Sequence, residues 1–289
     1  MRLRDALRIK SPIVREMLAE FIGTFILVTF AVASGAQYVL SRGELSSFLT
    51  VNFAGGMGLM FGVYWAGGVS GASLNPSVTL ALCLHGVIEW WKYPHYVLSE
   101  MLGAFTAAAV QFGVFYDGIR KFDGGVRQTY GPNATAGIFS TFPREEISTL
   151  NCFFDQVFGT FILISSILAI TDKNNMRPDK GLLPIALGSI VFAIGTYRDY
   201  NWFWVPIAGP LTGAVVSWCL YNLFIQLHWP PTRGEELGRV TGDDITVNGD
   251  LDSKDSKGGL ENPAFSGSNG QSALTLDIIF FRNCTACMH

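Results

Sequence analysis

The sequence is poor in charged residues and in the side chains that build enzyme active sites. Only 15% of the 289 residues are charged, and only four are histidine. It holds no Ser/His/Asp arrangement and no pair of histidines at metal-ligand spacing, so we expect neither an enzyme nor a bound metal or other cofactor. The net charge of −3 implies no general attraction to nucleic acid.

The five cysteines are scattered along the chain and do not indicate a metal site. Cys83, Cys152 and Cys219 lie in or beside apolar segments, where we expect them to pack as small hydrophobic side chains. Cys284 and Cys287 form a Cys-x-x-Cys pair, but no second pair or nearby histidine completes a zinc-ligand set.

Apolar residues, by contrast, are abundant. Hydrophobic residues make up 49% of the chain, phenylalanine occurs 22 times, and the mean hydropathy is +0.32. This composition excludes a disordered chain and favours a polytopic membrane protein over a soluble enzyme. We expect six transmembrane helices, over about 16–40, 48–66, 93–116, 152–170, 181–196 and 202–227.

The composition also divides the chain into three parts. Residues 1–12 are rich in Arg and Lys, and the apolar run that follows suits a spanning helix better than a cleavable signal. We expect a cytoplasmic segment over 1–12, a transmembrane domain over 13–228 and a tail over 229–289. The tail is rich in Gly, Asp, Ser and Asn, which predicts disorder. We place both termini in the cytoplasm.

A short glycine-rich stretch after the second apolar segment carries the most informative pattern. It reads Gly-Gly-Val-Ser-Gly-Ala-Ser-Leu-Asn-Pro-Ser-Val-Thr over residues 67–79. Asn75 suits a helix N-cap and Pro76 suits the first helical position. The pattern predicts a helix of about three turns, ending near Val87 and ~18 Å long, which is roughly half of a ~30 Å hydrocarbon core. The alternative is an ordinary loop and amphipathic helix in a soluble protein.

A half-helix that begins near the membrane midplane has chemical consequences. Non-helical backbone at that depth is tolerated where protein buries it or where it lines a wet cavity. The carbonyls of Gly71, Ala72 and Ser73 would offer hydrogen-bond acceptors to such a cavity. The N-terminal end of the half-helix would add a positive partial charge, which favours small neutral solutes and opposes cations and protons.

The stretch over residues 70–79 resembles the first Asn-Pro-Ala box of the aquaporins, and its surroundings resemble the aquaglyceroporin branch. Ser73 stands where that family usually has histidine, and Ser77 where it usually has alanine. The resemblance implies an all-α membrane bundle of six transmembrane helices with re-entrant half-helices, assembled as a homotetramer in membrane lipid. It places at the pore Gly71, Ala72, Ser73, Asn75, Pro76 and Ser77.

The resemblance assigns roles to three further residues. Gly55 lies twenty positions before Asn75, where the family usually has an aromatic residue at the outer constriction, and a glycine there would widen the filter for glycerol or larger polyols. Glu20 lies inside the first apolar segment, where the family uses a glutamate to hold the re-entrant loops. The alternative is a carboxylate near the interface that reaches water. Gln156 is the corresponding support residue in the second half.

The two halves of the chain have similar sequence motifs in the same order, as in channels built from inverted repeats. Residues 20–27 read Glu-Phe-Ile-Gly-Thr-Phe-Ile-Leu, and residues 156–163 read Gln-Val-Phe-Gly-Thr-Phe-Ile-Leu. A Gly-Ala pair follows in each half, at Gly103 and at Gly213.

The second repeat is shorter than the first. The distance from Gly23 to Gly103 is 80 positions, whereas that from Gly159 to Gly213 is 54, so the second half lacks 26 residues. The deficit falls after Thr196, where the family would have its second Asn-Pro-Ala box and half-helix. We therefore predict an aquaporin-like bundle with an incomplete second repeat.

Two functions are compatible with these patterns. The first is a passive channel of the plasma membrane for glycerol, water and other small neutral solutes. The alternative is a non-conducting truncated aquaglyceroporin that assembles with or regulates full-length subunits, because half of one pore wall is missing. The sequon Asn133-Ala134-Thr135, in the polar loop expected over 117–148, is a candidate glycosylation site on the outer face.

Overall fold

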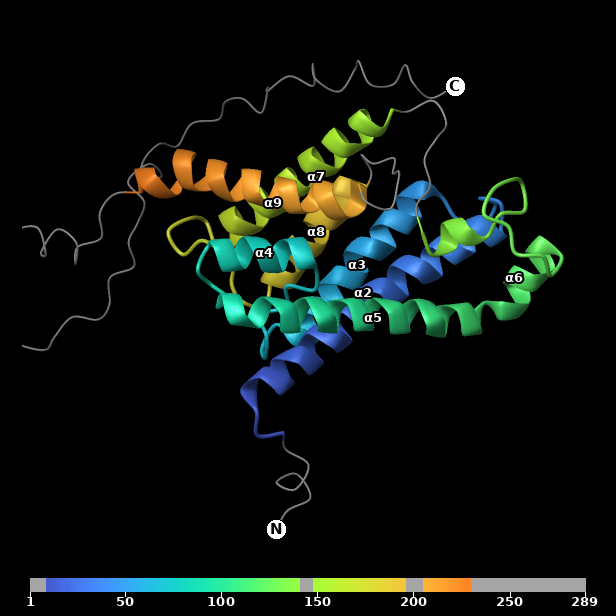
Figure 1. The fold of residues 1–289 in the computed structure, drawn as a ribbon, viewed down its shortest axis with the longest axis horizontal. Helices are drawn as coiled ribbons and strands as arrows, with labels where there is room; N and C mark the ends of the chain where they lie inside the picture. The colour runs from blue at the N-terminus through green and yellow to red at the C-terminus, as the bar shows by residue number, and fades with distance from the viewer. Residues whose placement is uncertain (1–8, 141–147, 196–204, 230–289) are drawn as a thin grey trace, which may run out of the picture. The chain divides into compact units, whose positions relative to one another are not determined.

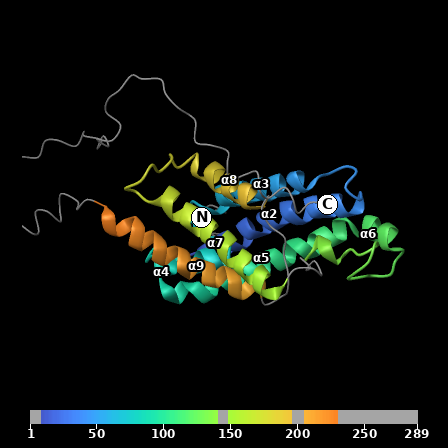
Figure 2. The same cartoon turned by 90° about the horizontal axis from the view of Figure 1, so that it is seen from above.

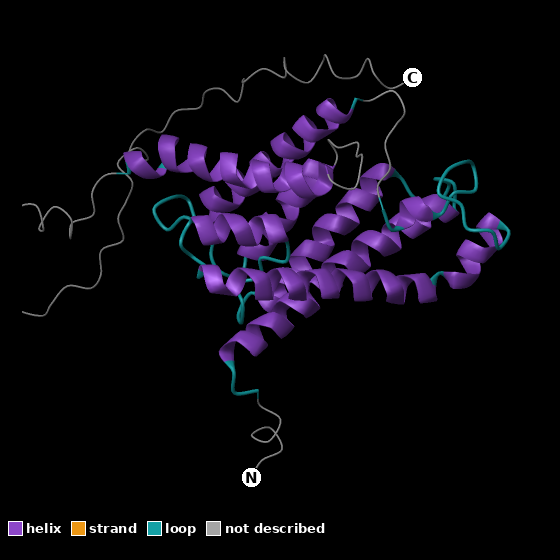
Figure 3. Ribbon diagram, in the orientation of Figure 1, coloured by secondary structure: helices purple, strands orange, loops and turns teal. Residues whose placement is uncertain are grey.

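The computed structural model describes residues 9–140, 148–195 and 205–229, which form helices joined by loops without any strand (Figures 1 and 3). The all-α prediction is confirmed. The helices are α2 (Pro12–Leu40), α3 (Phe48–Ala66), α4 (Pro76–Leu84), α5 (Tyr93–Val114), α6 (Tyr116–Asp123), α7 (Thr149–Thr171), α8 (Leu183–Gly195) and α9 (Val205–Phe224). Short 3-10 turns occur at Trp90–Lys92, Ala136–Ile138 and Gln226–His228.

Five of the described helices, α2, α3, α5, α7 and α9, are long and apolar enough to cross a membrane. The sixth apolar helix, α8, has 13 described residues and is ~20 Å long, which is shorter than a ~30 Å hydrocarbon core. Three of the predicted features lie wholly or mostly outside the described residues: the segment 1–12, of which only 9–12 are described, the point after Thr196 where the deficit falls, and the tail beyond Trp229.

The half-helix α4 begins as predicted and ends earlier than predicted. Asn75 caps it, because its Oδ1 accepts a hydrogen bond of 2.8 Å from the Ser77 N–H, and Pro76 occupies the first turn. The expected extension to Val87 is wrong, because Gly86 adopts a left-handed conformation with φ of 76°. The Gly86 N–H bonds to Cys83 O and the Val87 N–H to Leu82 O, a pattern that closes a helix C-terminus.

The inverted repeat predicted from sequence is visible in the packing. Helix α2 packs along α5, and α7 packs along α9 (Figures 1 and 2). A Cβ added to Gly103 would collide with the carbonyl oxygen of Phe21, and one added to Gly213 would lie 2.5 Å from that of Val157. Phe21 and Val157 occupy matched positions of the two repeats, so the same backbone contact recurs in both halves.

Further glycines bring α3 close to its neighbours on both sides. An added Cβ on Gly62 would lie 2.7 Å from the Gly23 carbonyl oxygen of α2. On the other side, an added Cβ on Gly56 or on Gly188 of α8 would lie 2.6 Å from the other residue's carbonyl oxygen. Helix α3 therefore connects the two halves through contacts in which backbone meets backbone.

The polar loop expected over 117–148 begins with a helix instead, α6. Gly124 ends that helix in the left-handed region with φ of 67°. Burial of the Asp123 carboxyl favours its neutral form, but hydrogen bonds from the Gly125 N–H and from Arg127 outweigh this effect and lower the pKa of Asp123. Further along, Arg42 donates a hydrogen bond of 2.9 Å to Asn133 Oδ1 and so ties the loop to the end of α2.

Candidate pore site

A cavity of about 1370 Å³ lies beside the glycine-rich stretch. Its wall includes residues from 67 to 75 together with side chains of α3, α7 and α8. Of the residues predicted at the pore, those on this wall are Gly55, Gly71, Ala72, Ser73 and Asn75.

The stretch before α4 turns sharply because three of its residues are left-handed. The φ angles are 92° at Gly71, 58° at Ala72 and 51° at Leu74. Side chains other than glycine rarely adopt this region, and each such residue costs on the order of 1–3 kcal/mol, so the surrounding structure must hold the turn in place. Leu74 contributes by packing into the space left by Gly23 and Gly62.

Glu20 binds the turn directly. Its Oε2 accepts hydrogen bonds from the Leu74 N–H at 2.8 Å and from the Ser73 Oγ at 3.2 Å, and its Oε1 accepts one from the Ser73 N–H at 3.2 Å. The side chain is 0% exposed. A carboxylate that accepts from two backbone amides and one hydroxyl can hold a strained turn, because charge-assisted hydrogen bonds are the stronger ones.

A second buried carboxyl, Glu100 of α5, joins this cluster, and the sequence reasoning missed it. Its Oε1 lies 2.6 Å from the Thr79 Oγ1 and 3.1 Å from the Ser73 Oγ. The Thr79 Oγ1 also lies 2.9 Å from the Ser73 Oγ. An acidic residue within an apolar spanning segment is itself a signal of function, and it was as readable for Glu100 as for Glu20.

At the start of α4, Asn75 presents its amide to the cavity. Its Oδ1 is occupied by the Ser77 N–H, whereas its Nδ2 has no hydrogen-bond partner among the described residues. Pro76 fills the first helical position, where no N–H is needed, and Ser77 is buried behind it. The Asn75 Nδ2 is therefore available to donate a hydrogen bond on the cavity wall.

The two remaining predicted residues differ in their surroundings. Gly55 lies on the cavity wall, and an added Cβ there would meet no atom within 4 Å, so a side chain at this position would enter open space. Gln156 is 2% exposed, and its Nε2 has no hydrogen-bond partner in the described part of the chain. The structure thus brings Glu20 to the re-entrant turn and leaves its repeat counterpart without such a contact.

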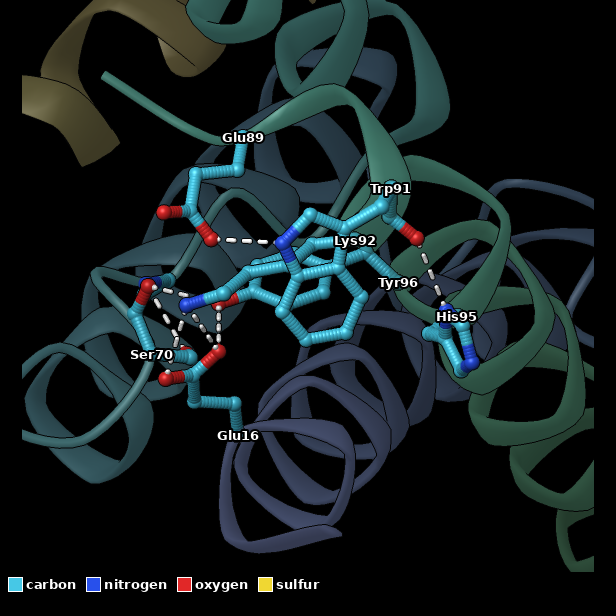
Figure 4. A network of polar contacts seen from close by, with 8 residues as sticks. Glu16, Ser70, Glu89, Trp91, Lys92, His95 and Tyr96 are labelled. Carbon is cyan, nitrogen blue, oxygen red and sulfur yellow. Dashed lines mark hydrogen bonds and ion pairs between the residues drawn. The ribbon is translucent and has the colours of Figure 1, made fainter. Parts of the chain in front are cut away.

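Another polar network, also missed from sequence, includes residues of the cavity wall, and its contacts are drawn in Figure 4. The Tyr96 hydroxyl lies 3.0 Å from Glu16 Oε2 and 3.3 Å from the Ser70 carbonyl oxygen. Lys92 forms an ion pair of 3.0 Å with the same Glu16 oxygen. These contacts connect the N-terminal part of α2 and the start of α5 to the glycine-rich stretch.

Taken together, a half-helix begins inside a bundle of apolar spanning helices, and its first turn presents amide and carbonyl groups to a cavity. Such a turn can replace the hydrogen bonds of a small uncharged solute, and its own amide and carbonyl groups carry no formal charge that would stabilise an ion. These features define the class of polytopic membrane channels for neutral solutes.

Comparison with known proteins identifies the family. The family model of the major intrinsic proteins matches residues 8–198. The chain is similar to Aquaporin-9 of Homo sapiens, with 39% identity over 259 residues that cover 78% of this chain and 88% of the relative. For Aquaporin-10 of Homo sapiens the identity is 35% over 265 residues, covering 80% and 88%. The chain belongs to the major intrinsic protein family, and it is a channel rather than an enzyme.

A solved structure supports the fold. The aquaglyceroporin from Plasmodium falciparum aligns with a TM-score of 0.64 at 23% sequence identity, covering 74% of this chain and 97% of that one. The aquaporin-like bundle predicted from the sequence is therefore confirmed.

Proposed function

We propose that this protein is a passive channel for glycerol and water, and for other small neutral solutes of similar size. The observation that carries the proposal is the free amide of Asn75 beside the carbonyls of a left-handed turn, on the wall of a large cavity. A glycerol hydroxyl can accept from the amide and donate to a carbonyl as it passes. The comparisons favour this function over that of a non-conducting variant.

Gly55 provides the test of solute selectivity. We expect Gly55→Phe to lower the glycerol permeability of proteoliposomes by about tenfold or more and to lower water permeability much less, because the ring fills open space in the cavity. Light scattering after glycerol and sucrose gradients measures both rates. Gly113→Phe is the matched control, because an added Cβ at Gly113 also meets no atom within 4 Å and Gly113 does not line the cavity. Wild-type vesicles that take up glycerol no faster than empty vesicles would contradict the proposed function.

We further propose that the channel is a homotetramer in the plasma membrane, with both termini in the cytoplasm and residues 229–289 as a cytoplasmic tail. Large apolar side chains on the outside of the bundle support contact with lipid or with other subunits. Trp65 of α3 is 67% exposed and Phe105 of α5 is 74% exposed.

This orientation places Asn133 on the outer face, and we propose that it carries an N-linked glycan. Its loop has an ordered structure, since Arg42 bonds to Asn133 Oδ1 and Thr135 is buried. In protein expressed in animal cells, we expect digestion with an N-glycosidase to shift the electrophoretic mobility of the wild type. The same treatment should leave the electrophoretic mobility of Asn133→Gln unchanged. A wild-type band that does not shift would argue against both the glycan and the orientation.

A further inference from the structure

The cluster around Glu100 contains more oxygen–oxygen contacts at hydrogen-bond distance than it has hydroxyl protons to donate. Four atoms belong to it: Glu20 Oε2, Ser73 Oγ, Thr79 Oγ1 and Glu100 Oε1. They make four contacts between 2.6 and 3.2 Å. If both carboxyls are ionised, the only protons are those of Ser73 and Thr79, and each can be donated once.

Burial and the nearby Glu20 oppose a negative charge on Glu100, and hydrogen bonds from Thr79, Ser73 and the Asn75 backbone compensate for this only in part. The Glu100 side chain is 1% exposed, and its Oε2 has no hydrogen-bond partner among the described residues. A buried carboxylate with an unpaired oxygen is costly, and two carboxylates that share one hydroxyl repel each other.

The other ionisable groups around Glu100 do not neutralise it either. Glu20 faces it from α2, Cys83 faces it from α4, and Tyr93 and Tyr96 belong to its own helix. The cation at this end of α5, Lys92, is paired with Glu16. Each of these neighbours is therefore neutral, acidic or already paired.

We propose that Glu100 is a positioning residue that carries a proton at neutral pH. A chain of hydrogen bonds, each donated in the direction from Glu100 toward Glu20, then connects it to the re-entrant turn. The acid proton on Oε1 is donated to Thr79 Oγ1, the Thr79 proton to Ser73 Oγ, and the Ser73 proton to the ionised Glu20. The three contacts along this chain, of 2.6, 2.9 and 3.2 Å, then each hold one proton, and the fourth, of 3.1 Å between Ser73 Oγ and Glu100 Oε1, holds none. Glu20 remains the acceptor for the backbone amides of Ser73 and Leu74.

The chain of bonds makes the turn sensitive to alkaline pH. When Glu100 loses its proton to solvent, Thr79 must turn its hydroxyl toward the new carboxylate, and the contact between Thr79 and Ser73 loses its proton. Ser73 is then bracketed by two negative charges, which weakens the hold on the turn that carries Asn75. Because the folded state holds a proton that an exposed glutamate has already lost, stability falls as the pH rises. The fall in permeability that we expect with it depends on the proposed channel function.

Infrared spectroscopy of the full chain in detergent tests the proton itself. At about pH 7 we expect a carbonyl stretching band of a protonated carboxylic acid that is absent from Glu100→Gln and disappears from the wild type by about pH 10. The glutamine variant should fold, because its amide donates to Thr79 as the acid does. Identical spectra of the two proteins at neutral pH would overturn the proposal, whether or not the chain conducts.

Thermal unfolding and transport test the consequence. Between about pH 5 and about pH 9, the melting temperature of the wild type should fall by several degrees more than that of Glu100→Gln, and only the wild type should lose glycerol permeability several-fold. Glu44→Gln, in an exposed loop, is the matched control and should keep the wild-type response. A pH response that persists in Glu100→Gln would assign the effect to another group and overturn the proposed role of Glu100.

Discussion

Replacing Glu20 with leucine is expected to abolish glycerol permeability and to destabilise the protein strongly. The substitution removes the acceptor of two backbone amides and one hydroxyl in a buried site, and each unsatisfied donor costs about 1–3 kcal/mol. The left-handed residues Ala72 and Leu74 would then relax, and Asn75 would leave the cavity wall. Permeability in proteoliposomes and thermal unfolding in detergent measure the two effects. Glu20→Gln keeps one acceptor oxygen and should fall between wild type and Glu20→Leu.

The repeat itself supplies a control for this experiment. Gln156 occupies the position matched to Glu20, but its Nε2 has no hydrogen-bond partner in the described part of the chain. We expect Gln156→Leu to be neutral or mildly stabilising, because it removes an unpaired buried amide. If the two substitutions lower permeability and thermal stability equally, the effect of replacing Glu20 cannot be attributed to its hydrogen bonds with the re-entrant turn.

Replacing Gly103 with valine is expected to prevent the bundle from forming. A Cβ at this position collides with the carbonyl oxygen of Phe21, and neither helix can move without opening the contact between α2 and α5. Overpacking of this kind typically costs 1–3 kcal/mol or more, and here the obstacle is backbone rather than a flexible side chain. The yield of monodisperse protein in size-exclusion chromatography should fall to near zero.

Two further variants show whether the contact or the residue type is responsible. Gly213→Val should fail in the same way, because an added Cβ there lies 2.5 Å from the Val157 carbonyl oxygen. Gly113→Val, on the same helix as Gly103 but with no atom near the added Cβ, should express normally. Normal folding of Gly103→Val would mean that α2 and α5 do not approach as closely as described.

The sequence predicted the membrane bundle well because its signals are local. Apolar segments, the Asn75-Pro76 helix start and the two matching Gly-Thr segments can each be read without knowing what lies opposite. The end of α4 was misplaced because apolar residues continue to Val87, although Gly86 carried the signal for a stop. Helix α6 was missed because its polar residues resemble those of a loop.

The site was only partly predictable because the polar side chains that hold the glycine-rich stretch in place depend on tertiary contacts. Four of the five predicted residues on the cavity wall, Gly71, Ala72, Ser73 and Asn75, lie in one short stretch of chain. The contacts of Glu100 with Thr79 and Ser73 join residues 21 and 27 positions apart, and they exist only once α5 packs against α4. Similarly, the Tyr96 hydroxyl lies near the Ser70 carbonyl oxygen although 26 positions separate them. Hydropathy and helix signals contain no information about such pairs.

The meeting of α3 and α8 has a mechanical consequence. Gly56 and Gly188 touch through bare backbone, and the side chains of Phe192 and Met60 pack beside this contact. Both helices also face the cavity, through Gly55 and Asn52 on one side and Leu187 and Val191 on the other. A side chain at either glycine would therefore force α3 and α8 apart, and the width of the passage depends on the absence of a Cβ at these two positions.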